Sequence, residues 1–269
     1  MIDWLRPDDF DFNEAPLNQW YHAATAIVSY LVLIRWIERR ALERGVSAKT
    51  MDLVRRVQAV HNLALCLASL AMVLLMSYTI VLYDLRFFPN DPDTDTDYLI
   101  CPTSPTPHQG RIGYVVYLFY ASKYWELLDT IIQMVKGRRP PSYNFHVWHH
   151  TCYLAICWAY MKYRSSLSAL AVIVNGSVHV VMYYYYYLQV RGKPVHWKHW
   201  ITRIQIIQFI AGYVFFLTTV KRIYWDLQDC NGKLVLFIHA GFNMTMLVGF
   251  VQILLRIKRE QKQVNKKLQ

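Results

Sequence analysis

The sequence predicts an all-α, polytopic membrane protein with a single domain over residues 1–269. Three observations support this fold class. The composition is 55% hydrophobic and only 17% charged, and an aromatic share of 15% fits the Trp and Tyr belts of membrane interfaces. The apolar residues form runs of about 20, which is the length an α-helix needs to cross a bilayer. The basic residues fall in alternate loops between these runs.

Seven apolar runs are expected to be transmembrane helices, joined by loops that we number in chain order. They cover residues 21–37, 57–83, 111–136, 145–161, 167–188, 200–220 and 234–256. The first 20 residues are acidic and contain no apolar stretch, so we expect no cleavable signal peptide there.

The net charge of +11 is distributed in a way that favours a membrane protein over a nucleic-acid-binding one. Basic residues gather in loops 1, 3 and 5 and in the tail 257–269, whereas loop 2 and residues 1–20 are acidic. The positive-inside rule therefore places these basic loops and the tail in the cytosol. An odd number of spans then places the N-terminal segment on the lumenal side.

The same topology separates the five cysteines. Cys101 in loop 2 and Cys230 in loop 6 share the non-cytosolic side, where an oxidising lumen favours a disulfide, so we expect these two to be bonded. Cys66, Cys152 and Cys157 lie within spans and are expected to be apolar packing residues.

Three histidines at the start of the fourth span, His146, His149 and His150, are the strongest sign of chemistry. Positions i, i+3 and i+4 share one helix face, and ionisable groups in a membrane segment usually mark a functional site. Imidazoles in this pattern fit either a metal site or metal-free acid–base or nucleophilic catalysis.

The number of histidines favours metal-free catalysis, with no cofactor. A di-iron desaturase or hydroxylase needs several histidine boxes, and this sequence has one. Of its ten histidines, we expect only His179 to join the three above in the site. His196 and His199 are interpreted as surface residues of loop 5. A single zinc ion on the three clustered histidines stays an open alternative.

Polar residues recur at helical spacing in three further spans. They are Lys123, Glu126 and Asp129 in the third span, Asn175, His179, Met182 and Tyr186 in the fifth, and Thr202, Gln205 and Gln208 in the sixth. The charges of the third span are expected along one side of a helix, where they could also form a structural ion-pair network. The predicted topology lets all these sets face one cavity that opens to the cytosol. Such a cavity suits a substrate with a polar head and a long apolar tail.

In order, spacing and position, these residues resemble the four signature motifs of the ELO family, and the resemblance covers nearly the whole chain. The motifs are Lys123-x-x-Glu126-x-x-Asp129-Thr130, His146-x-x-His149-His150, Asn175-x-x-x-His179-x-x-Met182-Tyr183-x-Tyr185-Tyr186 and Thr202-x-x-Gln205-x-x-Gln208. Members are fatty acid elongases of the endoplasmic reticulum. The final Lys266-Lys267-Leu268-Gln269 is similar to a dilysine retrieval signal. Phe145 and Pro141 depart from the family's commonest wording, which has Leu and Gln there.

The resemblance implies an acyltransferase that condenses a long-chain acyl-CoA with malonyl-CoA, giving 3-oxoacyl-CoA, carbon dioxide and CoA. It implies six helices in a barrel around an acyl tunnel, with the seventh outside. Its partners would be these two thioesters, membrane lipid, and the ketoreductase, dehydratase and enoyl reductase of the elongation cycle, with a homodimer also allowed. Basic residues at the cytosolic mouth are candidates for the CoA phosphates or for lipid headgroups. They are Arg138, Arg139, Lys193, Lys198 and Arg203.

A Claisen condensation needs an acyl acceptor, a stabilised enolate and an acid or base. His149 is the hypothesised nucleophile, forming an acyl-imidazole, with His179 as its acid–base partner and Asp129 or Glu126 orienting an imidazole. Cys152 lies on a different helix face from His150, which disfavours a thiol nucleophile.

Substrate-binding roles go to the other motif residues. Amides of Asn175, Gln205 and Gln208 could donate hydrogen bonds to developing oxyanions. Lys123, Tyr186 and Thr202 complete the set. In a competing scheme the histidines act only as bases, and the malonyl-derived enolate attacks the thioester directly. A seven-span transporter or receptor is the alternative from a different class, because mid-membrane polar groups also line transport paths.

Overall fold

The computed structural model describes residues 6–44, 46–84, 99–103 and 108–268. These residues are helical apart from turns, loops and one isolated bridge between Asp11 and Gln109, which confirms the all-α class for this part of the chain. The helices are α1 (Trp20–Arg44), α2 (Ala48–Asp84), α3 (Gly110–Glu126), α4 (Leu128–Val135), α5 (Tyr143–Tyr163), α6 (Ser168–Val190), α7 (Lys198–Tyr224) and α8 (Lys233–Leu268).

Every predicted span falls on a helix, with one division. The run 111–136 is split at Leu127 into α3 and α4, so the expectation of one continuous helix there is wrong. Lys123 and Glu126 end α3, whereas Asp129 lies in the first turn of α4. At the other end of the chain, α8 continues through most of the predicted tail, as far as Leu268.

Among the described helices, four are long and apolar enough to cross a membrane by length and composition. The segments are Ala48–Leu82, Ser168–Val190, Trp200–Tyr224 and Lys233–Arg259. The protein therefore has several membrane-capable helices, and the full count of seven spans stays a prediction.

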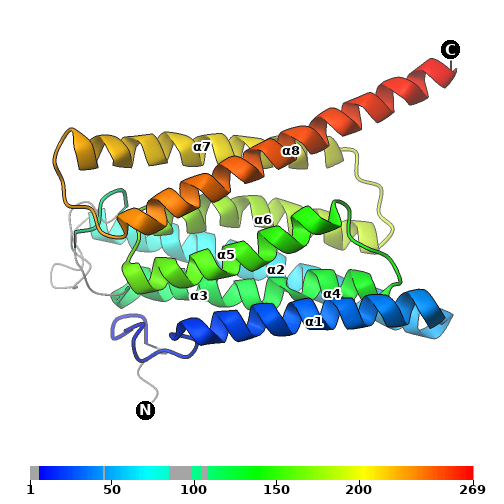
Figure 1. Ribbon diagram of the computed structural model, residues 1–269, viewed down its shortest axis with the longest axis horizontal. Coiled ribbons are helices and arrows are strands. Elements are labelled where there is room, and N and C mark those ends of the chain that lie inside the picture. Colours follow the sequence, from blue (N-terminus) through cyan, green and yellow to red (C-terminus); the bar gives the residue numbers. More distant parts are fainter. Residues whose placement is uncertain (1–5, 45, 85–98, 104–107, 269) are drawn as a thin grey trace.

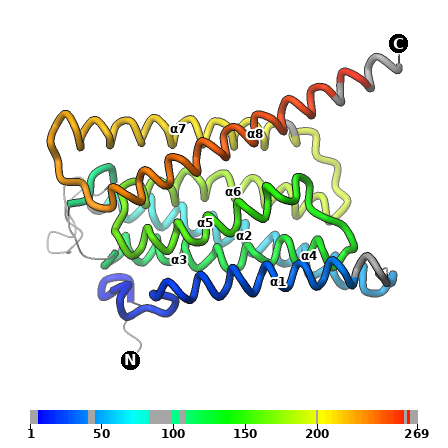
Figure 2. Tube along the Cα trace, in the orientation of Figure 1, coloured from blue at the N-terminus to red at the C-terminus, as the bar shows by residue number. Residues whose placement is uncertain are grey.

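The helices lie alongside one another and form a closed circuit of contacts (Figure 1). Helix α2 packs on α6, α6 on α7, α7 on α8, α8 on α5, α5 on α3, and α3 on α2. Helix α1 lies outside this circuit, along α4 and α5. Helix α8 crosses α7 obliquely, and its C-terminal part projects beyond the other helices (Figure 2).

The two ends of the bundle differ in chemistry. The α1–α2, α4–α5 and α6–α7 connections and the C-terminus lie at the end on the right of Figure 1, which we call the basic end because exposed Arg138, Arg191 and Lys193 lie there. The opposite end holds the N-terminal segment and the α5–α6 and α7–α8 connections. The loops that are basic in the sequence thus lie together at one end of the molecule. The acidic residues 91–97 of loop 2 lie outside the described residues.

A disulfide between Cys101 and Cys230 marks the opposite end, with their Cα atoms 4.7 Å apart. Both cysteines are buried in an apolar cluster with Leu167, Ile223 and Leu236, and we call this the disulfide end. The α7–α8 turn packs closely against Ser165, which explains why a glycine occupies position 232. Gly232 has a φ of +65°, and an added Cβ there would lie 2.7 Å from the Cα of Ser165.

Candidate active site

The first turns of α5 gather the three motif histidines, as their spacing predicts. The ring centroids of His146 and His150 are 4.4 Å apart, and those of His149 and His150 are 4.9 Å apart. His150 is buried, and the Nε2 atom of His146 is buried without a hydrogen-bond partner. The cluster is therefore compact, with His149 as its outermost ring toward α8.

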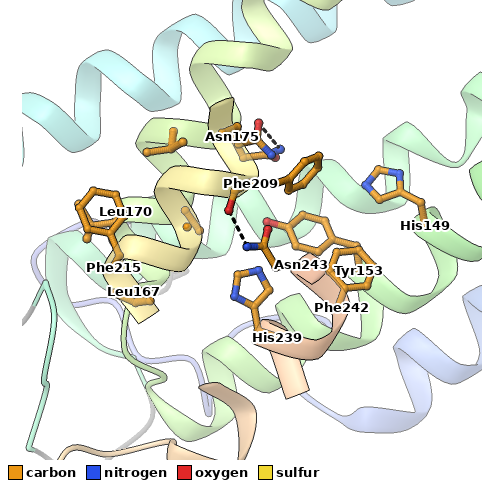
Figure 3. Close-up of a pocket in the computed structure, with 14 residues that line it drawn as sticks. His149, Tyr153, Leu167, Leu170, Asn175, Phe209, Phe215, His239, Phe242 and Asn243 are labelled. Carbon is orange, nitrogen blue, oxygen red and sulfur yellow. Dashed lines mark hydrogen bonds between the residues drawn. The ribbon is translucent and has the colours of Figure 1, made fainter. Parts of the chain in front are cut away.

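A pocket lies between α5, α6, α7 and α8, and His149 stands at one end of it (Figure 3). Leu167, Leu170 and Phe215 line the other end, where they also pack against the cluster around the disulfide. The full lining is His149, Tyr153, Leu167, Leu170, Ala171, Val174, Asn175, Gln208, Phe209, Gly212, Phe215, His239, Phe242 and Asn243. An imidazole thus heads a mainly apolar cavity that runs toward the disulfide end.

Aromatic stacking holds the His149 ring. Its plane is within 18° of Tyr153 at a centroid distance of 5.9 Å and within 19° of Phe242 at 6.0 Å. Tyr153 and Phe242 stack on each other at 5.4 Å. Parallel rings from α5 and α8 restrict the imidazole to one orientation facing the pocket.

Helix α8 contributes pocket residues that the sequence did not predict, including His239 and Asn243. Of the four histidines expected in the site, only His149 lines this pocket, and His239 lines it without having been expected there. Asn243 donates from Nδ2 to the Phe209 carbonyl at 2.9 Å, tying α8 to α7. The i, i+4 spacing of two polar residues in an apolar span was the available signal.

Lys123 and Glu126 form a buried ion pair with an Nζ–Oε1 distance of 2.6 Å, and both side chains are 3% exposed. The same Glu126 oxygen lies 3.5 Å from Nδ1 of His179 on α6. The Lys123 ammonium also lies 3.9 Å from the centre of the Phe119 ring. This pairing makes two charges tolerable in the interior and places a carboxylate beside His179.

Asp129 is held separately, by α2 and α6. Its Oδ2 accepts a hydrogen bond from the Tyr183 hydroxyl at 2.6 Å, and its Oδ1 lies 2.7 Å from Nε2 of His61. His61 was not among the predicted site residues. Nothing local in the sequence pairs it with an aspartate 68 positions away, because the contact depends on how α2 packs on α4.

Of the predicted site residues, His149, Asn175 and Gln208 line the pocket. Asn175 donates to Gln208 across it at 3.4 Å, whereas Gln205 contacts the sulfur of Met182 at 3.7 Å. The remaining predicted residues of the four motifs lie outside the lining. They are His146, His150, His179, Lys123, Glu126, Asp129, Tyr186, Thr202 and Gln205.

Residues 15–265 match the ELO family, whose description is GNS1/SUR4 family. The chain belongs to the ELO family. A Dictyostelium discoideum protein named as a fatty acid elongase is 34% identical over 248 residues, which cover 92% of this chain and 79% of that protein. Fatty acid elongase A of the same organism is 32% identical, covering 77% of this chain and 73% of its own. Very long chain fatty acid elongase 7 of Rattus norvegicus is 31% identical, covering 51% and 48%.

The five predicted phosphate contacts of this ELO protein are exposed and lie outside the pocket lining. Arg139 pairs with Glu38 of α1 and lies over the Tyr143 ring at 5.1 Å. Arg203 lies over the Trp200 ring at 4.8 Å. These basic side chains therefore lie outside the pocket, and the residues that line the pocket include no Lys, Arg, Asp or Glu.

His196 is exposed, while the side chains of His199, Lys266 and Lys267 lie outside the described residues. Cys152 is half-buried and does not line the pocket.

Phe145, one of the two departures from the common motif, packs directly on Gly249 and lies 5.6 Å from the Phe250 ring, whereas Pro141 is exposed. Within the described ranges, no three His, Cys, Asp or Glu side chains are grouped so as to hold a metal ion.

Proposed function

We propose that this ELO-family protein is a fatty acid elongase that condenses a long-chain acyl-CoA with malonyl-CoA to give 3-oxoacyl-CoA, carbon dioxide and CoA. The position of His149 carries this proposal, because it places a nucleophilic or basic ring at the head of an apolar pocket. Leu167, Leu170 and Phe215 at the far end suit the methyl end of an acyl chain. The names of the relatives support the same substrate class.

We also propose that the chain crosses the endoplasmic reticulum membrane seven times, with a lumenal N-terminus and a cytosolic C-terminus. Helices α1 and α5 have 25 and 21 residues, and α3 and α4 together make one further span. The closed circuit of helix contacts supports a six-helix barrel around the pocket. The gathering of basic loops at one end supports the orientation.

In the proposed reaction His149 first accepts the acyl group. Its unprotonated ring nitrogen attacks the thioester carbonyl, the carbon–sulfur bond breaks, and the CoA thiolate takes the proton that the other ring nitrogen releases. Malonyl-CoA then loses carbon dioxide, and the electron pair of the broken carbon–carbon bond forms an enolate. The enolate attacks the acyl-imidazole, the carbon–nitrogen bond breaks, and the departing imidazole takes up one proton. No cofactor enters this sequence.

Neighbouring side chains have defined tasks in this scheme. The amides of Asn175 and Gln208 line the pocket and can donate to an oxyanion at the reacting carbonyl. His179, beside Glu126, supplies the proton to the departing imidazole. In the competing scheme the same histidines act only as bases, and the enolate attacks the acyl thioester without an acyl-enzyme.

An elongation assay tests the proposal. Microsomes that contain the protein, given labelled malonyl-CoA and a panel of acyl-CoAs, are expected to form labelled 3-oxoacyl-CoA. His149→Ala should abolish the product, whereas His196→Ala, which changes an exposed histidine outside the pocket, should not. Wild-type microsomes without labelled product across the panel would exclude the reaction and favour a transporter or receptor.

A further inference from the structure

His61 is a buried histidine that the proposed reaction does not yet use. It lies in the apolar part of α2 and is only 6% exposed. A buried imidazole is costly unless its nitrogens find partners. The partner of its Nε2 is Asp129, at 2.7 Å. An ionised carboxylate only accepts hydrogen bonds, so Nε2 carries the proton and donates it.

Asp129 is fixed by two hydrogen bonds from different helices. His61 of α2 donates to Oδ1, and the Tyr183 hydroxyl of α6 donates to Oδ2 at 2.6 Å. Hydrogen bonds to a carboxylate are stronger than neutral ones, and two on separate oxygens set both its position and its rotation. Without His61, one oxygen would lose its donor and the carboxylate could turn.

Tyr183 links this carboxylate to the reaction centre. The side chain is fully buried, and its ring meets the imidazole of His179 edge-on, with centroids 5.5 Å apart. His179 has Glu126 as its other neighbour, held in turn by Lys123. Two supports therefore confine His179, one from α3 and one that begins at His61.

We propose that His61 is a positioning residue for the elongation reaction, acting through Asp129 and Tyr183 on His179. This inference rests on the proposed function. Because no residue of α2 is among those that line the pocket, loss of His61 should slow the reaction without weakening substrate binding. A small displacement of a reacting group lowers kcat by roughly 10- to 100-fold, which is the loss expected here.

The test compares purified variants for kcat, KM and thermal stability. His61→Phe fills the space without a donor to Asp129, and His61→Gln restores an N–H donor. Cys66→Ala is the matched control, since it removes a different side-chain contact of α2, in which the thiol lies 3.4 Å from the Val180 carbonyl of α6. We expect His61→Phe to lose kcat with KM unchanged, His61→Gln to recover much of it, and Cys66→Ala to keep the wild-type kcat.

A double-mutant cycle separates positioning from general stability. If His61 acts through Asp129, then His61→Phe combined with Asp129→Asn loses no more kcat than Asp129→Asn alone. An additive loss would overturn the inference, as would a His61→Phe enzyme with wild-type kcat or an unchanged kcat with only lower thermal stability.

A last variant keeps the test decisive if His61→Phe does not accumulate. Tyr183→Phe retains the ring beside His179 but removes the donor to Asp129, and it should show the same loss of kcat at unchanged KM. Wild-type kcat in Tyr183→Phe would then overturn the route from His61. Each variant is compared with an active wild-type enzyme. A failure of this inference about His61 can therefore be told apart from a wild-type protein that does not elongate.

Discussion

Two regions inside the helix bundle hold polar side chains with different partners. On α2, α3, α4 and α6 a chain of contacts runs from the Lys123–Glu126 ion pair through His179 and Tyr183 to Asp129. The pocket between α5, α6, α7 and α8 holds polar groups with fewer partners. Aromatic rings flank His149, and Oδ1 of Asn175 is buried without a hydrogen bond. Paired groups hold the geometry, and unpaired groups are left available to a substrate.

Breaking the buried ion pair should have the largest effect. Lys123→Met leaves the Glu126 carboxylate buried without its cation, and such a loss costs about 3–5 kcal/mol of stability. The thermal unfolding of the detergent-solubilised protein measures it. Adding Glu126→Gln should restore much of the stability because the uncompensated charge is removed.

An exposed pair of the same length provides the control. Lys233 and Asp229 are also 2.6 Å apart, and the hydrogen bond from Lys233 lowers the pKa of Asp229. Both side chains face solvent, so Lys233→Met should leave the unfolding temperature unchanged. Equal losses in the two lysine variants would contradict the distinction between buried and exposed pairs.

The pocket's far end depends on a covalent link. Cys101→Ala with Cys230→Ala opens a loop of 129 residues and should cost about 2–4 kcal/mol. Reductant should lower the unfolding temperature of the wild type and leave that of the double variant unchanged. If reductant has no effect on the wild type, the two cysteines are not bonded in the protein.

Asn175 tests whether an amide of the pocket, which makes only one long hydrogen bond through Nδ2, serves the reaction. Asn175→Ala removes a proposed oxyanion donor, and loss of one such donor lowers kcat by roughly 100-fold. Its stability should stay within about 0.5 kcal/mol, because the side chain makes only a 3.4 Å hydrogen bond. A variant that is less stable but fully active would place Asn175 with the structural groups instead.

Tyr30 gives the smallest expected effect. Its hydroxyl donates to Thr130 at 2.7 Å and ties α1 to α4, outside the circuit of helices around the pocket. Tyr30→Phe should cost about 1 kcal/mol, the usual value of one neutral hydrogen bond, and leave elongation unchanged. A clear loss of activity in this variant would show that α1 contributes to the site.

Local periodicity explains which features the sequence predicts well. The positions of the spans follow from the lengths of apolar runs, and the gathering of His146, His149 and His150 follows from helix geometry alone. The charges of the loops likewise predict which connections lie at the basic end. Each of these features depends on residues close together in the chain.

Contacts between helices explain what the sequence did not reveal. The division at Leu127 has no glycine or proline beside it to mark it. His61 meets Asp129, and His239 enters the pocket, only because α2 and α8 pack where they do. A spacing rule describes one helix face, whereas these residues come together from different helices.

The most direct measurement is a single turnover with labelled acyl-CoA and no malonyl-CoA. If His149 is the acyl acceptor, the purified enzyme should release one CoA per site and retain the acyl group, and peptide mass spectrometry should locate that group on His149. Subsequent addition of malonyl-CoA should convert it to 3-oxoacyl-CoA. Absence of CoA release until malonyl-CoA is added would contradict the acyl-imidazole and favour direct condensation.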